Sequence, residues 1–445
     1  MTYIQQALAF LLGIGPLIIF HEFGHYIVAR LCGVKVLRFS IGFGKVLWSR
    51  KFGKDQTEWA ISAIPLGGYV KMLDNRDPAT AAASDADRTR EFASQSVWKR
   101  IAIIAAGPIA NFILAILIFW ALFMHGVEDA STSLRFMPET TPAYVAGVRE
   151  GDRVLTVNGE ATPGWSDLHF AVLKAAMDKD ALELELEQRD GVRRSVTLPP
   201  AAFAGLSLDK DVMRPLGLMP RQNPALVSQL PEGPAKQAGV QVGDQVRAID
   251  GRPVRDRVEM IDMIRASGGK PLTLSVLRDG RLLAIAVTPR IDPVTKLPAI
   301  GAALATSIDM VVVAVGPVAA LSKAVRGTWD KAILQLKMIG KIFTGAISWK
   351  NVTGPITMAD YAQQTISAGA VVFLAFVATV SISLGVMNLL PIPVLDGGLL
   401  LYYSVEVLTG RPLPEQVDEY VRRLGVVMLV MLMMLAIFND IARRL

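Results

Sequence analysis

Long apolar segments without charged residues dominate the sequence, and they restrict the chain to folds that a lipid bilayer can accommodate. Three of them are long enough to cross the hydrocarbon core as helices: 3–29, uncharged as far as Phe20, then 101–124, and one within 361–395. A fourth, 424–439, is close to the lower limit of about 17 residues, but its Leu, Met and Val content still favours a span. We therefore predict four membrane-spanning helices.

The composition agrees with a membrane protein and narrows the chemistry. Hydrophobic residues make up 52% of the chain and charged residues only 19%, whereas soluble proteins average about 25% charged residues. Cys32 is the only cysteine, so the chain can form neither an internal disulfide nor the usual thiolate zinc site. A fifth apolar segment, 310–322, contains Pro317, and we expect it to be interfacial or buried rather than spanning.

The distribution of basic residues predicts the orientation of the spans. The loop between the first two spans is rich in them: Arg30, Lys35, Arg38, Lys45, Arg50, Lys51, Lys54, Lys99 and Arg100. Such loops stay on the cytoplasmic side of a membrane. We therefore expect the loop 402–423 to be cytoplasmic too, and both termini and the long segment from 126 to about 367 to lie outside.

The external segment contains an internal repeat. One set of short motifs recurs with a constant offset of 92 residues: Pro142-Ala143, Ala146-Gly147-Val148, Gly151-Asp152 and Asn158-Gly159 return as Pro234-Ala235, Ala238-Gly239-Val240, Gly243-Asp244 and Asp250-Gly251. A constant offset indicates a duplicated domain. In each copy a helical pattern precedes an alternating strand, an Asp-Gly turn and a return strand, which predicts a β-hairpin.

The repeated pattern resembles the PDZ domains of bacterial proteases. The resemblance implies two small β-rich modules, 126–218 and 219–308, each with a groove that takes an extended peptide by strand addition. Leu216-Gly217 and Ile300-Gly301 resemble the loop that cradles a peptide carboxylate in such modules. Alternatively, the modules bind no peptide and act as spacers or size filters.

We assign residues 309–366 to a linker between the second module and the third span. Within the linker, 321–344 mixes Lys and Arg with Leu, Ile, Trp and Phe. This pattern predicts an amphipathic helix on the membrane surface; an ordinary surface helix of the preceding module is the alternative. Residues 1–125 then contain the first two spans and the loop between them, and residues 367–445 contain the last two spans.

The first span carries a metal-binding motif, His21-Glu22-Phe23-Gly24-His25. On a helix, residues four apart lie on one face at about 5–6 Å, so that two imidazoles can share one ion. Glu22 is rotated away from the two histidines and is suited to act as a general base toward water. Ionisable groups inside a membrane segment cost about 2.5–3.5 kcal/mol each on the insertion scale, which favours a functional site over a helix end reaching the interface.

Asp396 is the predicted third ligand. A zinc site needs three protein ligands and leaves a fourth position open, and Asp396 is the only acidic residue between Asp360 and Glu406. It follows Pro391, Pro393 and the end of the third span, so the helix must break there. A broken helix at membrane depth is tolerated beside protein or a wet cavity. In the alternative, Asp396 only caps the next helix.

Together, His21–His25 and the segment 388–397, with the pattern N-x-x-P-x-P-x-L-D-G, resemble the site-2 protease family of intramembrane zinc metalloproteases. The resemblance covers the whole chain, and the chain is most similar to bacterial members of the family that have tandem PDZ domains. It implies Zn²⁺ as cofactor, with His21, His25 and Asp396 as ligands and Glu22 as the catalytic acid/base. It also implies that Asn388 helps to hold substrate.

Two further segments match the same family. Gly107-Pro108-Ile109-Ala110-Asn111 matches a motif of its second span. Residues 39–46 and 58–64 are rich in strand formers, and 65–69 reads as a turn after them. From the residues alone we predict a short cytoplasmic sheet here, whereas the resemblance implies a β-hairpin that dips into the membrane near the zinc.

The sequence therefore predicts an α-helical, four-span membrane protein with two β-rich external modules. By resemblance it is an inner-membrane endopeptidase of bacteria, with its active site toward the cytoplasm. Its implied substrates are single-span proteins already trimmed outside, such as an anti-sigma factor, and signal-peptide remnants; we expect no nucleic-acid partner. A metal-ion transporter and a non-catalytic PDZ scaffold in the membrane remain as alternatives.

Overall fold

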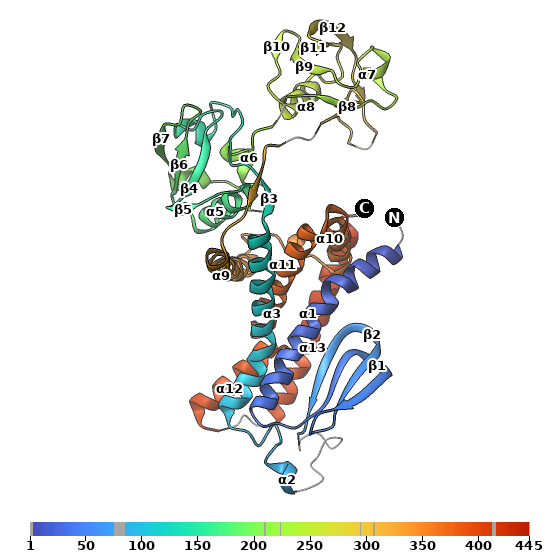
Figure 1. Cartoon of the computed structure of the whole chain (residues 1–445), viewed down its shortest axis with the longest axis vertical. Coiled ribbons are helices and arrows are strands. Elements are labelled where there is room, and N and C mark those ends of the chain that lie inside the picture. Colours follow the sequence, from blue (N-terminus) through green and yellow to red (C-terminus); the bar gives the residue numbers. More distant parts are fainter. Residues whose placement is uncertain are drawn as a thin grey trace. The chain divides into compact units, whose positions relative to one another are not determined.

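The structure is a computed structural model that describes residues 3–74, 85–208, 211–222, 224–293, 295–305, 308–411 and 415–444 (Figure 1). It divides the chain into two compact units. The first unit, Met1–Val127 with Ala314–Leu445, is mostly helical and contains the predicted site. The second unit, Glu128–Val313, contains the predicted repeat.

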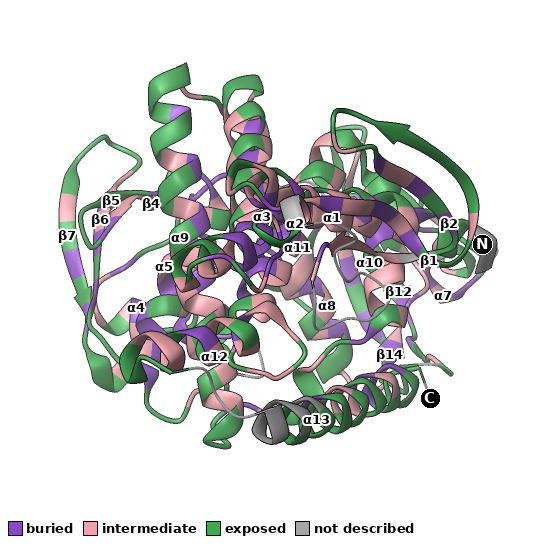
Figure 2. Ribbon diagram, turned by 90° about the horizontal axis from the view of Figure 1, so that it is seen from below, coloured by how far each residue is buried: buried purple, intermediate pink, exposed green. Residues whose placement is uncertain are grey.

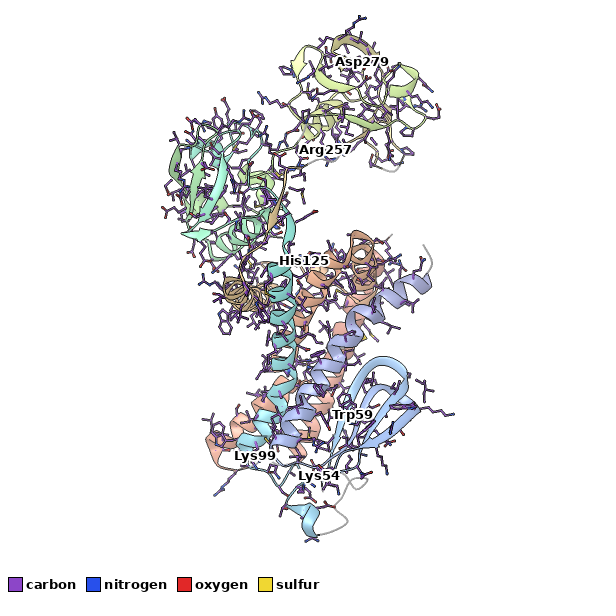
Figure 3. The ribbon with its side chains drawn as sticks, in the orientation of Figure 1. Lys54, Trp59, Lys99, His125, Arg257 and Asp279 are labelled. Atoms are coloured by element: carbon purple, nitrogen blue, oxygen red, sulfur yellow. The ribbon has the colours of Figure 1, made fainter. Side chains whose placement is uncertain are left out.

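Among the described residues of the first unit, four helices are long and apolar enough to cross a membrane, which confirms the four predicted spans at the level of secondary structure. They are α1 (Tyr3–Leu31), α3 (Val97–His125), α11 (Ala370–Leu389) and α13 (Glu415–Ala442). Lys99 and His125 mark the two ends of α3 (Figure 3). The third span is shorter than the uncharged segment, because Gly369, with φ +116°, separates α11 from the preceding α10 (Pro355–Ala368).

Close backbone approaches hold α1, α3 and α11 together. Gly24 of α1 faces α3 so tightly that a Cβ there would overlap the carbonyl oxygen of Ala106. On the other side of α3, a Cβ on Gly385 of α11 would lie 3.1 Å from the Phe112 ring. Small residues at such contacts are how helices pack in lipid, where no hydrophobic force drives them together.

The described part of α13 is exposed along most of its length (Figure 2), but its C-terminal end is firmly attached to α10. Asp440 is buried and accepts hydrogen bonds from the backbone N–H of Gly354 and Ile356, both at 2.9 Å, and from the Thr357 hydroxyl at 2.6 Å. One carboxylate thus satisfies the free N–H groups at the start of α10. After α11 the chain leaves helical geometry for 390–395 and resumes in α12 (Asp396–Thr409), so the predicted helix break is confirmed.

The strands predicted between the first two spans are present and longer than predicted: β1 (Val36–Phe52) and β2 (Thr57–Met72). The prediction of a turn at 65–69 is confirmed in part. The chain reverses direction between Ile61 and Gly68, because β1 pairs with 58–61 in one direction and with 68–71 in the other. The predicted turn extends too far along the chain, since Gly68 and Tyr69 are already paired with Ile41 and Ser40. Another turn lies at 53–56, where Gly53 and Gln56 adopt positive φ.

The second unit contains two sheets of like topology, as a duplicated domain would. Each copy has a four-stranded sheet with the same strand order, β5-β4-β6-β7 and β10-β9-β11-β12. The strands are β4 (Arg153–Val157), β5 (Glu160–Ala161), β6 (Leu182–Glu187), β7 (Arg193–Leu198), β9 (Gln245–Ile249), β10 (Arg252–Pro253), β11 (Leu272–Arg278) and β12 (Arg281–Val287). The helices α5 (Trp165–Asp178) and α8 (Arg257–Ala266) precede the hairpins, and Asp279 lies in the second hairpin turn (Figure 3).

The two copies also share a buried ion pair. Asp152 accepts the backbone N–H of Arg149 at 2.7 Å, and its counterpart Asp244 accepts that of Gln241 at 2.8 Å. Each aspartate is then paired with an arginine of its own hairpin, Arg194 or Arg278. Leu, Val and Met side chains fill a separate hydrophobic core in each copy.

Shorter elements complete the fold. They are α2 (Asp85–Arg88), β3 (Val127–Ala130), α4 (Pro142–Val145), η1 (Pro200–Phe203), α6 (Met213–Leu216), β8 (Val227–Gln229), α7 (Pro234–Gln237), β13 (Arg290–Ile291), β14 (Pro298–Ala299), β15 (Ala303–Leu304), β16 (Met310–Val313) and η2 (Trp349–Asn351). The fifth apolar segment, 310–322, is divided between β16 and the next helix, so it does not span.

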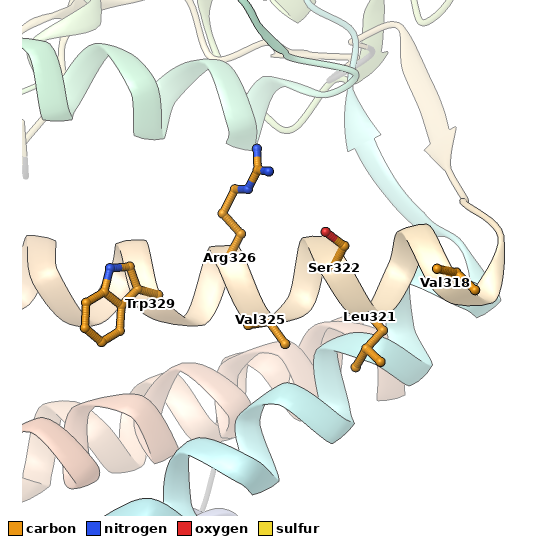
Figure 4. Close-up of a pocket in the computed structure, with 6 residues that line it drawn as sticks. All are labelled: Val318, Leu321, Ser322, Val325, Arg326 and Trp329. Carbon is orange, nitrogen blue, oxygen red and sulfur yellow. The ribbon is translucent and has the colours of Figure 1, made fainter.

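The predicted amphipathic segment 321–344 lies on α9 (Pro317–Phe343), apart from Thr344, which caps the end of the helix. Its buried side is made of small residues, including Ala320 and Ala324. Other apolar side chains of α9 are exposed, and the six residues drawn in Figure 4 line an open hollow: Val318, Leu321, Ser322, Val325, Arg326 and Trp329.

Candidate metal centre

The two histidines of α1 lie side by side, as their spacing predicts. His21 and His25 are one helical turn apart, and their ring centroids are separated by 4.9 Å at an interplanar angle of 83°. Their Nε2 atoms are 3.3 Å apart. Both side chains are buried, with 8% and 7% of their surface exposed, so the pair is shielded from solvent by the surrounding helices.

Asp396 joins this pair from the start of α12. Its Oδ2 lies 3.1 Å from Nε2 of His21 and 3.5 Å from Nε2 of His25. The loop 390–395 brings it there by folding back tightly: a Cβ on Gly397 would overlap the carbonyl oxygens of Leu389 and Leu390. The predicted third ligand and the predicted helix break are therefore two parts of one arrangement.

The three side chains fit a divalent cation. Their ligand atoms all lie within 4.8 Å of one another, and the buried Oδ2 of Asp396 has no donor in hydrogen-bonding geometry. A buried carboxylate oxygen without a donor is unfavourable unless a cation compensates it. Two imidazole nitrogens and one carboxylate oxygen form a donor set that suits zinc and leaves a fourth position open.

Glu22 lies beside the cluster without belonging to it. It is half-buried and within electrostatic reach of His21, His25 and Asp396. Strand β2 passes close by, since a Cβ on Gly68 would lie 3.0 Å from Cγ of Glu22. The hairpin of β1 and β2 therefore borders the side of the cluster where Glu22 lies.

Helices α3 and α11 provide the next layer of contacts. Nδ1 of His25 lies 2.8 Å from the carbonyl oxygen of Ile103. Nδ1 of His21 lies 3.1 Å from Nδ2 of Asn111 and 3.5 Å from Nδ2 of Asn388. The structure thus brings the predicted substrate residue Asn388 to the edge of the metal cluster.

Asn111 and Gly107 are the residues to which sequence reasoning gave no role. Both belong to the motif noted in the second span, and a Cβ on Gly107 would overlap Nε2 of His25. Their spacing of four residues puts them on one face of a helix. That spacing was the available signal, but the sequence did not indicate which face of α3 meets α1.

The predicted peptide-binding residues of the modules lie in the second unit and do not join this cluster. Leu216 and Ile300 are buried in the cores of their copies, with 0% and 4% of their surface exposed. Gly217 and Gly301 have φ of +86° and +71°, a backbone conformation that favours glycine. A peptide-cradling role for them stays a prediction, and it would have to use backbone atoms.

A buried cluster of two histidines and one aspartate, in a unit with four described helices apolar enough to cross a membrane, fits a metal-dependent membrane enzyme, and comparison with known proteins gives its family. The model of peptidase family M50 matches residues 9–432. The chain belongs to this family of intramembrane zinc metalloproteases, the site-2 proteases. It is thus a zinc metalloprotease, as predicted.

Individual relatives cover nearly the whole chain. The chain is 37% identical to the regulator of sigma-E protease of Escherichia coli K12, over 100% of both chains. It is 36% identical to the regulator of sigma E protease of Salmonella typhimurium LT2, and 41% identical to a Ralstonia nicotianae protein with the provisional name zinc metalloprotease, over 98% of each chain in both cases. These relatives and the four apolar helices support a multi-pass protein of the inner membrane.

Proposed function

We propose that the chain is an intramembrane endopeptidase that hydrolyses peptide bonds within or near the membrane segments of single-span proteins. The observation that carries the proposal is the convergence of His21, His25 and Asp396 within 4.8 Å, where the helix that carries both histidines is apolar enough to cross a bilayer. In this proposal the three residues hold zinc. The active site faces the cytoplasmic side, and the second unit and both termini lie outside.

Glu22 is the proposed acid/base. When bound, zinc supplies Lewis acidity that polarises a peptide carbonyl and makes water a better nucleophile. The Glu22 carboxylate accepts a proton from the attacking water, and the new C–O bond forms as the carbonyl π electrons move to oxygen. Glu22 then gives this proton to the departing amide nitrogen as the C–N bond breaks.

The edge of β2 is a proposed guide for the substrate. Residues 68–72 pair with β1 along one side in the register of the described residues, whereas Ile61 has partners on both sides, Ile41 and Trp48. Strand addition along 68–72 would extend the substrate backbone beside Glu22. An extended segment exposes the carbonyl groups that a membrane helix hides in its own hydrogen bonds.

The external repeats are proposed to be PDZ-like modules that control access to the site. Relatives named regulators of sigma-E protease favour an anti-sigma factor as one substrate, after a first cleavage outside; signal-peptide remnants are a second class. If the modules act as size filters, deleting 128–313 lets the protease cut untrimmed substrates. If intact substrates remain uncut by the deleted protein while trimmed ones are cleaved, the filter role is excluded.

Glu22→Gln tests the enzymatic proposal. The amide is nearly isosteric but cannot accept the proton of water, so purified full-length Glu22→Gln should retain one zinc per chain and lose cleavage of a single-span substrate. Zinc content and cleavage are measured on the same preparation. Equal cleavage by variant and parent contradicts the mechanism, and a parent without zinc contradicts the metal centre. The transporter and scaffold alternatives both predict no cleavage by the parent.

A further inference from the structure

Both metal-facing histidines are contacted by one face of α3. Ile103, Gly107 and Asn111 follow one another at intervals of four residues, so they form a stripe along the helix. Ile103 presents its carbonyl oxygen to Nδ1 of His25 at 2.8 Å. Gly107 leaves room for both rings, and Asn111 presents its amide to Nδ1 of His21 at 3.1 Å.

The proton on His25 is fixed by the first of these contacts. A carbonyl oxygen only accepts hydrogen bonds, so Nδ1 of His25 must be the donor. Its Nε2 then has a free lone pair directed at the cluster. This is the usual arrangement of a metal-binding histidine, whose other ring nitrogen donates to an oxygen of the protein.

The same requirement applies to His21. Its Nε2 faces His25 and Asp396, so a neutral, metal-binding His21 carries its proton on Nδ1. With Nδ2 of Asn111 toward Nδ1, two donors oppose each other, and Oδ1 of Asn111 is buried without a hydrogen-bond partner. The orientation of an Asn amide is assigned from its hydrogen bonds. Rotating this amide by 180° brings Oδ1 to the Nδ1–H of His21.

Asn388 is the other amide near Nδ1 of His21, but it is less suited to this task. Its Nδ2 is more distant, at 3.5 Å, and the residue is half-exposed beside the helix break. Asn111 is completely buried, with 0% of its surface exposed, and its backbone carbonyl accepts a hydrogen bond of 2.8 Å from Ser381. Because it is completely buried, Asn111 cannot meet a substrate, whereas Asn388 can.

We propose that Asn111 is a positioning residue for the metal centre: its amide oxygen accepts the Nδ1–H of His21 and so holds the tautomer and ring orientation in which Nε2 binds zinc. The proposal rests on His21 being a zinc ligand, as proposed above. A neutral amide does this inside the membrane without the additional charge that a carboxylate would bring. Asn388 is then free to bind the substrate backbone.

The test compares three variants of the full-length protein in detergent micelles. Asn111→Leu removes the acceptor at similar volume, Asn111→Asp retains an acceptor oxygen, and Ser381→Ala removes a neighbouring buried hydrogen bond without touching the amide. The Kd for zinc is measured by competition with a chromophoric chelator. Loss of an outer-shell partner weakens metal binding by about 10–100-fold, so Asn111→Leu should show this loss, while Asn111→Asp and Ser381→Ala stay close to the parent.

Further readouts separate positioning from general damage. The absorption spectrum of the Co²⁺-loaded protein should change in Asn111→Leu and be restored in Asn111→Asp. Excess zinc should restore the kcat of Asn111→Leu with KM unchanged. The proposal is overturned if Asn111→Leu binds zinc as tightly as the parent, if Asn111→Asp weakens binding equally, or if Ser381→Ala does so. A His21→Ala variant that still binds zinc like the parent would instead contradict the proposed ligand set.

Discussion

Gly107 of α3 lies so close to the His25 ring that a Cβ at this position would overlap Nε2, the ring nitrogen that belongs to the candidate metal cluster. The same Cβ would lie 2.8 Å from Cε1 of His21. No larger residue fits without moving both imidazoles. We predict that Gly107→Ala weakens zinc binding by at least about 10-fold, the effect of disturbing an outer-shell contact. Chelator competition on the full-length protein measures it.

Gly15→Ala is the matched control, because Gly15 lies on the same helix as the two histidines and a Cβ there would meet no atom within 4 Å. This variant should bind zinc and cleave substrate like the parent. If Gly107→Ala also behaves like the parent, the rings have room to move and the inferred rigidity of the site is wrong.

Asp396→Ala should lose both zinc and proteolysis. Two histidines alone are one ligand short of a zinc site, and alanine leaves a gap where Oδ2 now lies 3.1 Å from His21. We expect zinc to fall well below one per chain after dialysis. Full zinc occupancy in this variant would show that a different residue provides the third ligand. Glu406→Gln is a control for the loss of an acidic residue of α12, because Glu406 pairs with Arg100 away from the cluster.

The three proposed ligands could be picked out from the sequence because each has a local signal. His21 and His25 share a helical spacing, and Asp396 is an isolated acid after a proline-rich break. The contacts of Asn111 could not be predicted in the same way. They depend on the register between α1 and α3, which is set by the approach of Gly24 to Ala106, a tertiary contact with no signature in either helix alone.

The sheet of β1 and β2 shows a different limitation. The strand formers around Trp59 and Ile61 were sufficient to predict a strand, and the Gly67-Gly68 pair was interpreted as part of a turn from its composition. The chain does reverse between Ile61 and Gly68, but glycine permits a turn without fixing where it ends. Gly68 is already paired with Ile41, and Glu22 passes so close to it that a Cβ there would lie 3.0 Å from Cγ of Glu22.

The pH dependence of the second repeat should depend on Asp244. Its hydrogen bond with the Arg278 guanidinium lowers the pKa of this carboxyl below its ordinary value. A lowered pKa in the folded state means that the pair stabilises the repeat above the unfolded-state pKa of about 4, and that this stability is lost as the pH falls through the folded-state value. Asp244→Asn should therefore loosen the repeat at pH 7 and reduce its sensitivity to acid.

Amide hydrogen exchange of β9 and β11 in the full-length protein measures this effect, with rates referred to the intrinsic exchange rate at each pH. Asp262→Asn, which removes an exposed acid of α8 in the same repeat, should leave both protection and its pH dependence unchanged. Equal protection of β9 in Asp244→Asn and the parent at pH 7 would show that the buried pair adds nothing to stability.

The last prediction concerns how a membrane helix is opened for cleavage. Unwinding it in lipid leaves backbone groups that cost several kcal/mol each when unpaired, so the protease must offer other partners. Asn388, at the edge of the cluster and half-exposed, can supply an amide. We predict that Asn388→Ala slows cleavage of stable-helix substrates more than that of substrates with helix-weakening Gly or Pro near the cut, with zinc binding unchanged.

A matched series of substrates tests this prediction. In each substrate, a single Gly, Pro or Asn near the scissile bond is replaced by Leu. In the parent enzyme the replacements should slow cleavage, because leucine stabilises the helix that must open. In Asn388→Ala the difference between weak and stable helices should widen, mainly through kcat. Zinc affinity serves as the control. A loss of zinc in Asn388→Ala would show that Asn388, rather than Asn111, is the hydrogen-bond partner of His21. Cleavage rates that are independent of substrate helicity in both enzymes would exclude a role for Asn388 in opening the helix.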